Sequence, residues 1–241
     1  MSGESPSDAT PHLPRTGLAV PAAGVGRRMG GVKKPYLELC GEPVLVHALR
    51  PFLADPRVVA VRVALAPEDA ADPPEWIEAL DPRIRVVAGG QARADSVANA
   101  VAALPDDVEV ILVHDAARPL VEASAIDACI RMAATGKGAV VGVAATDTLK
   151  QLDESGRVIG TPDRSRIWHA QTPQGFPASV LRAALQRADL RATATDDASL
   201  VEAAGGEVVM VQGSPNNLKV TRPRDLPLAE FLMRMGRESD Q

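Results

Sequence analysis

The stretch that decides the fold is "VEVILVHDAARP" at residues 108–119, because it contains the most strand-like run in the chain. Its centre, residues 110–113, is apolar at every position, which is typical of a strand buried on both faces of a sheet. Asp115 and Arg118 follow directly. We therefore expect a central strand of a parallel sheet, with polar residues that carry chemistry at its carboxyl end.

Strand and helix patterns alternate on both sides of this stretch. Runs rich in β-branched residues predict strands at 18–20, 58–66, 84–89, 138–146 and 207–213. Ala- and Leu-rich segments predict helices at 43–54, 73–80, 93–104, 122–136, 178–188, 196–206 and 224–235. The helix at 93–104 is expected to be capped by Asp95 or Ser96. The alternation indicates an α/β fold, with a mostly parallel sheet and helices on both faces.

Residues 147–175 interrupt this alternation. They mix polar and apolar residues and carry a turn signal at Glu154-Ser155-Gly156, which favours a β-hairpin that protrudes from the main sheet. No internal repeat or linker divides the chain, so we expect a single domain over 17–236. The Ser- and Pro-rich, polar start at 1–16 is expected to be a disordered tail.

The composition excludes several classes of function. The 241 residues are 46% hydrophobic and 24% charged, with a formal net charge of −5, which gives no sign of binding to nucleic acid or to a membrane. No apolar run approaches the roughly 20 residues of a membrane span. Cys40 and Cys129 lie far apart, without metal-ligand spacing, and are expected to be reduced packing residues. We expect a cytoplasmic protein.

A loop rich in glycine and cations follows the first predicted strand, in the stretch "AVPAAGVGRRMGGVKKPYL" at 19–37. Gly24 and Gly26 let backbone N–H groups approach a ligand, and such groups favour phosphate oxygens. Arg28 and Lys34 lie just downstream and can reach the same oxygens. The plain alternative is a glycine turn with solvated cations around it. The spacing fits neither a P-loop nor a dinucleotide fingerprint, so the prediction is a polyphosphate site of another kind.

The ordered motifs resemble those of one family. "PAAGVGRRM" followed by a lysine resembles nucleotidyltransferases with a Rossmann-like sheet. The segments "GGQARADSV", "VHDAARP", "DTLK", "WHAQTPQ", "TDDASLVE" and "NNLKVTRPRDLPLAE" occur in the order found in 2-C-methyl-D-erythritol 4-phosphate cytidylyltransferases, enzymes of the non-mevalonate isoprenoid pathway. The resemblance covers about residue 18 to about residue 232.

The resemblance implies a reaction and a set of residues. The phosphate of 2-C-methyl-D-erythritol 4-phosphate would attack the α-phosphorus of CTP and release pyrophosphate, with Mg²⁺ or another divalent cation on the triphosphate. Arg28 and Lys34 would stabilise the transition state. The nucleotide would be bound by Ala22, Ala23, Gly24, Gly90, Ser96 and Lys219.

The sugar-phosphate side follows from the same resemblance. Asp115, a possible metal ligand, and Arg118 would bind the acceptor. The segment 147–175 corresponds to the arm by which two subunits form a homodimer. Arg164 and Thr172 would then reach into the partner's site, while Thr148, Thr195 and Lys219 would complete the pocket from the parent subunit. His114 is expected to point into packing and not to act as a base.

Some alternatives stay open at this point. The motif around the lysine departs from the usual pattern, so Lys33 competes with Lys34, and Arg166 competes with Arg164. Gln91 stands where the family often has an acidic residue. The acceptor could be ribitol 5-phosphate instead of methylerythritol phosphate. A nucleotide-binding regulator without catalysis is a further possibility, although the joint presence of Arg28, Lys34, Asp115 and Lys219 argues against it.

Overall fold

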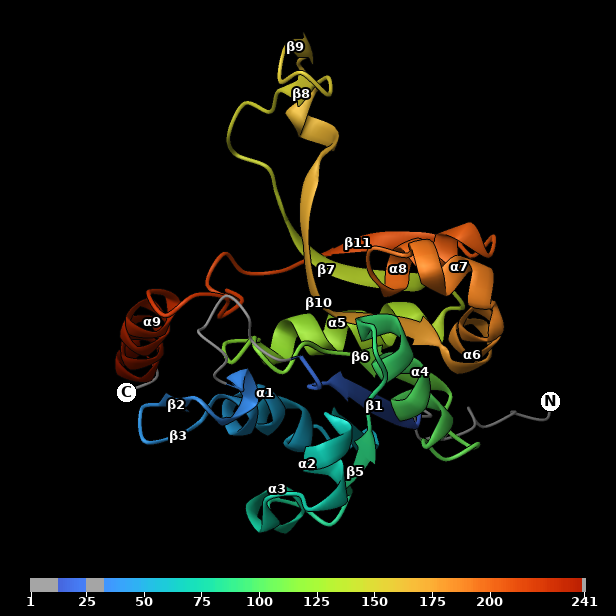
Figure 1. The fold of residues 1–241 in the computed structure, drawn as a ribbon, viewed down its shortest axis with the longest axis vertical. Helices are drawn as coiled ribbons and strands as arrows, with labels where there is room; N and C mark the ends of the chain where they lie inside the picture. Colours follow the sequence, from blue (N-terminus) through green and yellow to red (C-terminus); the bar gives the residue numbers. More distant parts are fainter. Residues whose placement is uncertain (1–12, 25–32, 240–241) are drawn as a thin grey trace, which may run out of the picture.

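A computed structural model describes residues 13–24 and 33–239. The centre is a seven-stranded sheet in the order β11-β7-β10-β6-β1-β4-β5 (Figure 1). Every neighbouring pair is parallel except the two pairs made by β10. The strands of this sheet are β1 (Thr16–Pro21), β4 (Val58–Leu65), β5 (Ile84–Ala88), β6 (Val110–Val113), β7 (Gly138–Ala144), β10 (Trp168–Pro177) and β11 (Val208–Gln212). The predicted α/β fold is confirmed.

Helices lie along both faces of the sheet. They are α1 (Val44–Leu53), α2 (Pro67–Ala71), α3 (Glu75–Ala79), α4 (Arg93–Ala102), α5 (Ala123–Ala134), α6 (Ala178–Gln186), α7 (Ala188–Thr193) and α8 (Asp197–Ala203). The last helix, α9 (Asp225–Ser239), packs instead beside the short strand β2 (Glu38–Leu39), to one side of the sheet (Figure 1). The sequence patterns missed α2 and α7, which are only one or two turns long. Within residues 13–24 and 33–239, no helix has the length and apolar character needed to cross a bilayer.

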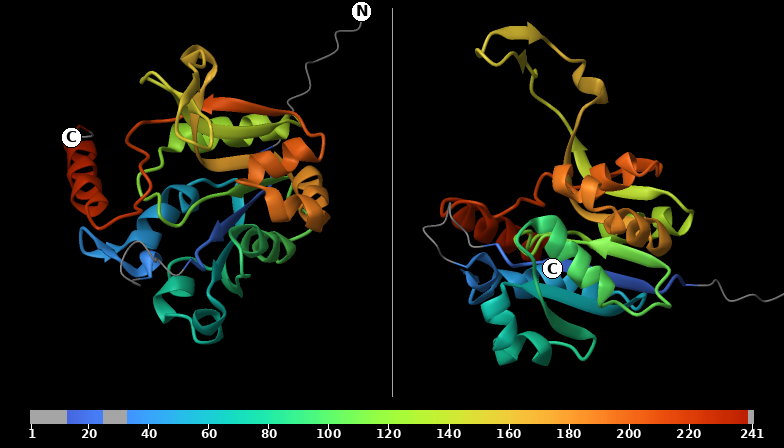
Figure 2. Two further views of the ribbon diagram at one scale, coloured as in Figure 1. Left: turned by 45° about the horizontal axis from the view of Figure 1, so that its top comes forward. Right: turned by 45° about the vertical axis from the view of Figure 1, so that its right-hand side comes forward.

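Alternate residues of β6 supply the two cores, one on each face of the sheet. Val110 and Leu112 pack in the core covered by α1 and α5, whereas Ile111 and Val113 pack in the core covered by α4, α6 and α8. All four are fully buried. The apolar run that predicts a doubly covered strand therefore has both faces in contact with helices (Figure 2).

The segment predicted as one excursion has two parts. At its tip, β8 (Gln151–Leu152) and β9 (Val158–Gly160) form a small antiparallel pair that stands off the body (Figures 1 and 2). Gly156 has a φ of +82°, which suits the predicted turn. The expectation that 168–175 belongs to the excursion is wrong, because these residues enter the main sheet as β10, antiparallel to β6 and β7.

The order of the strands creates a crevice. From β1 the chain runs through β4 to β5 on one side and then returns to place β6 on the other side of β1. Because these strands are parallel, their carboxyl ends lie at one edge of the sheet. Ligands of open α/β folds bind outside such ends, where the strand order reverses. The loops after β1, β5 and β6 therefore meet at the expected binding edge.

The core on the α4 face makes a stability prediction. Phe176 of β10 is fully buried, whereas Phe231 of α9 is 58% exposed. We expect Phe176→Ala to lower the free energy of unfolding by about 3–5 kcal/mol, because it removes buried surface and leaves a cavity. The same substitution at Phe231 should change it by less than about 0.5 kcal/mol. Urea unfolding of the two variants measures the difference, and equal losses would contradict this packing.

Candidate active site

A pocket opens at the binding edge, between the loop after β1 and the start of α4. Three loops and one distant lysine line it: Pro21, Ala22, Ala23, Gly24, Pro35, Gly90, Gln91, Ala92, Arg93, Ser96, Asp115, Ala116, Ala117 and Lys219. The loop after β1 is tied to the sheet by a hydrogen bond from Ala22 N–H to the Ala64 carbonyl, 2.8 Å long. Every described nucleotide-binding residue predicted from the sequence therefore borders one pocket. Arg28, which is predicted to stabilise the transition state, lies outside the described residues.

The two glycines after β5 let the chain pass close to its neighbours. A Cβ on Gly89 would stand 2.6 Å from Ala23 Cβ, and one on Gly90 would stand 2.3 Å from Asp95 Cβ. Both distances are far below van der Waals contact. The "GG" of "GGQARADSV" is therefore a steric requirement of the wall shared by the β1 loop and α4.

Ser96 has a different structural role from the predicted one. Helix α4 begins at Arg93, so Ser96 lies in its first turn and is not the cap. Its hydroxyl donates to the Ala92 carbonyl at 3.2 Å and accepts the Gly90 N–H at 3.1 Å. Asp95 accepts the Ala92 N–H at 3.2 Å. The N-cap position is Ala92, so neither residue is the N-cap itself; Asp95 closes the capping box from the third position, and Ser96 holds the glycine turn in place.

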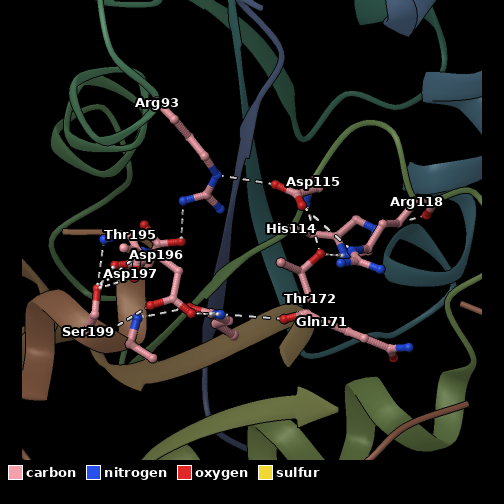
Figure 3. Close-up of polar contacts among 12 residues, drawn as sticks. Arg93, His114, Asp115, Arg118, Gln171, Thr172, Thr195, Asp196, Asp197 and Ser199 are labelled. Carbon is pink, nitrogen blue, oxygen red and sulfur yellow. Dashed lines mark hydrogen bonds and ion pairs between the residues drawn. The ribbon is translucent and has the colours of Figure 1, made fainter. Parts of the chain in front are cut away.

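Asp115 is the carboxylate of the pocket and is surrounded by cations. Lys219 Nζ lies 2.8 Å from its Oδ2, Arg93 Nε lies 3.2 Å from its Oδ1, and Arg118 Nε lies 3.6 Å from Oδ2 (Figure 3 shows the two arginines). Burial alone would raise the pKa of Asp115, but the positive charges of Arg93, Lys219 and Arg118 outweigh it and hold the pKa well below its usual range. Asp115 is therefore ionised at neutral pH.

Arg93 also reaches a second, deeper carboxylate. Its Nη1 lies 2.8 Å from Asp197 Oδ2 at the start of α8. Burial raises the pKa of Asp197, and the charge of Arg93 offsets only part of that effect. Arg93, Arg118 and Lys219 face two carboxylates, so the cluster has one net positive charge when both are ionised. This charge suits an anionic ligand.

His114 and Thr172 form a hydrogen-bonded support below Asp115. The carbonyl of Arg118 can only accept, so His114 Nε2, 3.1 Å away, carries the proton. His114 Nδ1 then accepts the hydroxyl proton of Thr172 at 3.0 Å. The same hydroxyl accepts the Asp115 N–H at 3.0 Å (Figure 3). His114 is fully buried and packs on Phe52, which confirms that it points into packing.

Arg118 supports the neighbouring loop. Its Nη1 donates to the Asn217 carbonyl at 2.7 Å, and Asn217 Nδ2 donates to the Thr172 carbonyl at 2.9 Å. Arg118 is absent from the described lining of the pocket, so its placement does not support the expected direct contact with substrate. It instead fixes the loop that carries Lys219.

The structure places two of the predicted threonines differently from the expectation. Thr172, expected to reach a partner, is buried in its own chain beside Asp115, within a register break of β10 between Ala170 and Gln174. Thr148, expected in the pocket of its own chain, lies exposed on the arm, close in sequence to Thr146, whose carbonyl accepts a 2.6 Å hydrogen bond from Arg164. Strand β10 returns from the arm to the sheet and carries Thr172 into the core, whereas Thr148 stays behind on the arm.

Thr195 lies at the turn before α8. It is exposed, and its backbone N–H and hydroxyl contact Ser199 Oγ at 3.1 and 3.4 Å. It is the neighbour of Asp196, which caps α8 by accepting the Ser199 N–H at 2.8 Å. The turn thus offers Thr195 at the surface and Asp197 to the buried cluster (Figure 3).

The two competing lysines differ in what holds them. Lys33 forms an ion pair with Asp69, and the hydroxyl of Tyr36 donates to the same carboxylate at 3.3 Å. Burial and the charge of Asp69 raise the pKa of Tyr36 to about 12, so its hydroxyl remains a donor. Lys34 begins a short 3₁₀ helix (Lys34–Tyr36), and the structure describes only its backbone.

Sequence reasoning missed Arg93, Asp197 and the His114–Thr172 hydrogen bond. The available signal for Arg93 was a cation three positions after the glycines of "GGQARADSV", because these follow a strand that ends at the binding edge. No local signal distinguishes Asp197 from Asp196. Their roles depend on which of them faces the sheet.

His114 generates a pH prediction. Burial disfavours the imidazolium and lowers its pKa from an ordinary 6.5 to about 4. Below pH 6.5 the His114 of the unfolded chain binds a proton, whereas that of the folded chain stays neutral. The free energy of unfolding therefore decreases as the pH is lowered, and this loss is complete below about pH 4. Between pH 7 and pH 5 the contribution is about 2 kcal/mol.

Chemical unfolding at pH 7, 6 and 5 measures this slope. His114→Gln should flatten it, whereas the same substitution at the exposed His169 should leave it unchanged. An unaltered slope in His114→Gln would contradict a neutral, buried imidazole.

Comparisons with known proteins agree with this geometry. A family model described as 2-C-methyl-D-erythritol 4-phosphate cytidylyltransferase matches residues 17–235. A protein of that name from Aeromonas hydrophila is 47% identical over 223 residues, which cover 89% of each chain. Another, from Acidobacterium capsulatum, is 43% identical over 91% of this chain and 98% of its own.

Solved structures extend the comparison to the fold. The 4-diphosphocytidyl-2C-methyl-D-erythritol synthase of Anaerococcus prevotii has a TM-score of 0.80 at 26% identity, covering 91% of this chain and 96% of its own. The 2-C-methyl-D-erythritol 4-phosphate cytidylyltransferase of Thermus thermophilus has a TM-score of 0.75 at 32% identity, covering 92% and 100%. The chain therefore belongs to the family of 2-C-methyl-D-erythritol 4-phosphate cytidylyltransferases.

Proposed function

We propose how this site carries out the reaction of the family, the transfer of CMP from CTP to 2-C-methyl-D-erythritol 4-phosphate. The observation that supports the assignment most strongly is the pairing of one carboxylate, Asp115, with Lys219 and Arg93 at the edge of a glycine-lined pocket. An oxygen of the acceptor's phosphate bonds to the α-phosphorus of CTP. The bond from that phosphorus to the β-phosphate oxygen breaks, and pyrophosphate leaves.

The main obstacle to this reaction is electrostatic, because an anion must approach a polyanion. Catalysis is then positioning together with neutralisation of charge, supplied by cations arranged before the reaction begins. We assign Arg28 and Lys34 to the triphosphate. The backbone of Ala22, Ala23 and Gly24, with Gly90, Ser96 and Lys219, binds the nucleotide.

The acceptor binds on the Asp115 side of the pocket in this proposal. Asp115 accepts hydrogen bonds from the hydroxyl groups of the acceptor, and Thr195 contacts the acceptor from the turn before α8. Thr172 supports Asp115 through the backbone N–H. Thr148 and Arg164 both belong to the arm segment, and we propose that both reach the acceptor in the partner's pocket.

A divalent cation fits this site in one particular way. Within the described part of the chain, no three His, Cys, Asp or Glu residues gather as a metal site. Mg²⁺ is often held by one or two carboxylates and the phosphates of a substrate. Both oxygens of Asp115 already contact cations, Arg93 on Oδ1 and Lys219 on Oδ2, so the ligands of the ion would come chiefly from the triphosphate. When bound, the ion neutralises charge on the phosphates.

A homodimer follows from the arm. The tip of the arm exposes Leu152, Val158 and Ile159, each more than half accessible to solvent. Three apolar side chains on a projecting hairpin favour burial against a second subunit.

Cys40 and Cys129 are unpaired, which supports the reducing cytoplasm as the location.

The assay that tests the function supplies CTP and Mg²⁺ with either acceptor. We expect pyrophosphate release with 2-C-methyl-D-erythritol 4-phosphate and little with ribitol 5-phosphate, which the names of the matching proteins do not favour. Release of pyrophosphate only with ribitol 5-phosphate would overturn the assignment of methylerythritol phosphate as the acceptor. Nucleotide binding without turnover on either would support a regulator.

The two lysines allow a matched test of the catalytic cation. We expect Lys34→Ala to lower kcat by a factor of several hundred, about 3–4 kcal/mol, because it removes a preorganised charge from the transition state. Lys33→Ala should lower it less than about fivefold, since Lys33 is engaged with Asp69 in a partly exposed pair. Steady-state kinetics of both variants decide the matter, and the opposite order would make Lys33 the catalytic residue.

The arm provides a test of binding across subunits. We expect Arg164→Ala to raise KM for the sugar phosphate at least about tenfold, because it removes a charge-assisted hydrogen bond. KM for CTP should change little. Arg166→Ala is the matched control, since Arg166 is also exposed and lies in the same 3₁₀ turn (Arg164–Arg166). An equal rise for both substrates in Arg164→Ala would exclude the proposed contact.

A further inference from the structure

Two adjacent aspartates at the start of α8 do different work. Asp196 caps the helix through Ser199 N–H at 2.8 Å and also accepts Gln174 Nε2 at 2.8 Å. Asp197 makes neither contact. Its side chain is 3% exposed, and its Oδ2 lies 2.8 Å from Arg93 Nη1 (Figure 3). Helix capping therefore does not explain the presence of Asp197.

A buried carboxylate is costly unless it serves a partner. Removing an ion from water costs several kcal/mol, and a well-packed apolar residue is often as stable as a buried ion pair. Asp197 sits among the apolar residues Ala198, Leu200 and Val201 of the α4-side core. Stability alone does not account for a charge at this position, so its effect on Arg93 is the informative one.

Arg93 bridges the two carboxylates with different atoms. Its Nη1 faces Asp197 and its Nε faces Asp115 Oδ1 at 3.2 Å. The contact with Asp115 is a hydrogen bond and the contact with Asp197 is an ion pair, so the guanidinium is held at two separate points. Lys219 contacts the other oxygen, Oδ2, at 2.8 Å. Both oxygens of Asp115 are thus held, and the order of contacts is Asp197, Arg93, Asp115, Lys219.

We propose that Asp197 is a positioning residue for the transfer reaction, which it serves by holding Arg93 so that Arg93 fixes the carboxylate of Asp115 in the pocket. This inference rests on the proposed function, since it assigns Asp115 to the acceptor. Asp197 itself is buried and touches no substrate. Loss of the Asp197 carboxylate removes the ion pair to Arg93 Nη1, and the carboxylate of Asp115 then loses the fixed orientation that the acceptor requires.

The expected signature is a split between the two substrates. Asp197→Asn keeps the size of the side chain and removes its charge. We expect kcat/KM for the sugar phosphate to fall about 10- to 100-fold, as is usual for a lost supporting contact. KM for CTP should rise much less, because the nucleotide loops are held by backbone contacts from Ala22 and Gly89 and only Lys219, paired with Asp115, links them to the change. A general loss of structure would affect both substrates alike.

Asp196→Asn is the matched control. It changes the neighbouring carboxylate in the same way and keeps a residue that caps helices well. Its kcat/KM values should stay close to those of the unmodified enzyme. Thermal melting of both variants shows that the comparison is made on folded protein.

Coupling tests whether Asp197 acts through Arg93. Arg93→Met alone should lower kcat/KM for the sugar phosphate at least as much as Asp197→Asn. In the double variant Arg93→Met/Asp197→Asn, the second change should cause no further loss, because its only route is already removed. Losses that multiply would show independent roles and overturn the proposal.

Arg93→Lys keeps the test decisive if Asp197→Asn does not fold. Lysine preserves the charge beside Asp197 but lacks the fork that bridges two carboxylates. We expect the same selective loss for the sugar phosphate. Kinetics equal to those of the unmodified enzyme, in either Asp197→Asn or Arg93→Lys, would overturn the inference. Failure of the unmodified enzyme to release pyrophosphate would instead refute the proposed function.

Discussion

The rest of the site depends on the charge of Asp115 and the cations that share it. A carboxylate buried to this extent is stable only because Arg93, Lys219 and Arg118 surround it. Each cation arrives from a different part of the chain: the start of α4, the loop after β11 and the turn after β6. The ion pairs therefore hold three loops together at one edge of the sheet, and the pocket has its shape because these loops meet there.

The two halves of the pocket are built by different means. On the proposed nucleotide side, close packing fixes the walls, since Gly89 and Gly90 pass Ala23 and Asp95 at distances that no Cβ tolerates. On the proposed acceptor side, buried hydrogen bonds fix the walls, through His114 and Thr172 below Asp115. Backbone walls suit a nucleotide recognised by shape and amides. A charged, hydrogen-bonded wall suits an acceptor with a phosphate and several hydroxyls.

Much of the fold could be predicted from the sequence, and the reason is local. The apolar run at 110–113 and the alternation around it report burial at each position, and that is enough for an α/β sheet. Strand β10 could not be predicted in this way, because its partners β6 and β7 are remote in sequence and "WHAQTPQGFP" has no clear period. The same limit applies to the site. Motifs located Asp115, Gly90 and Lys219, whereas the contact between Arg93 and Asp197 exists only after α4 and α8 pack on one face.

The hydrogen bonds also restrict the kind of catalysis that the described residues can perform. His114 is neutral at physiological pH, and both of its ring nitrogens are engaged, so it has no free position for a substrate proton. Asp115 is ionised but is bound by cations on both oxygens, which makes it a weak base. Among the described residues that line the pocket, no histidine occurs. A reaction whose nucleophile is already an anion needs no proton removed. Transfer to a phosphate monoester is compatible with these described residues, because its nucleophile is an anion.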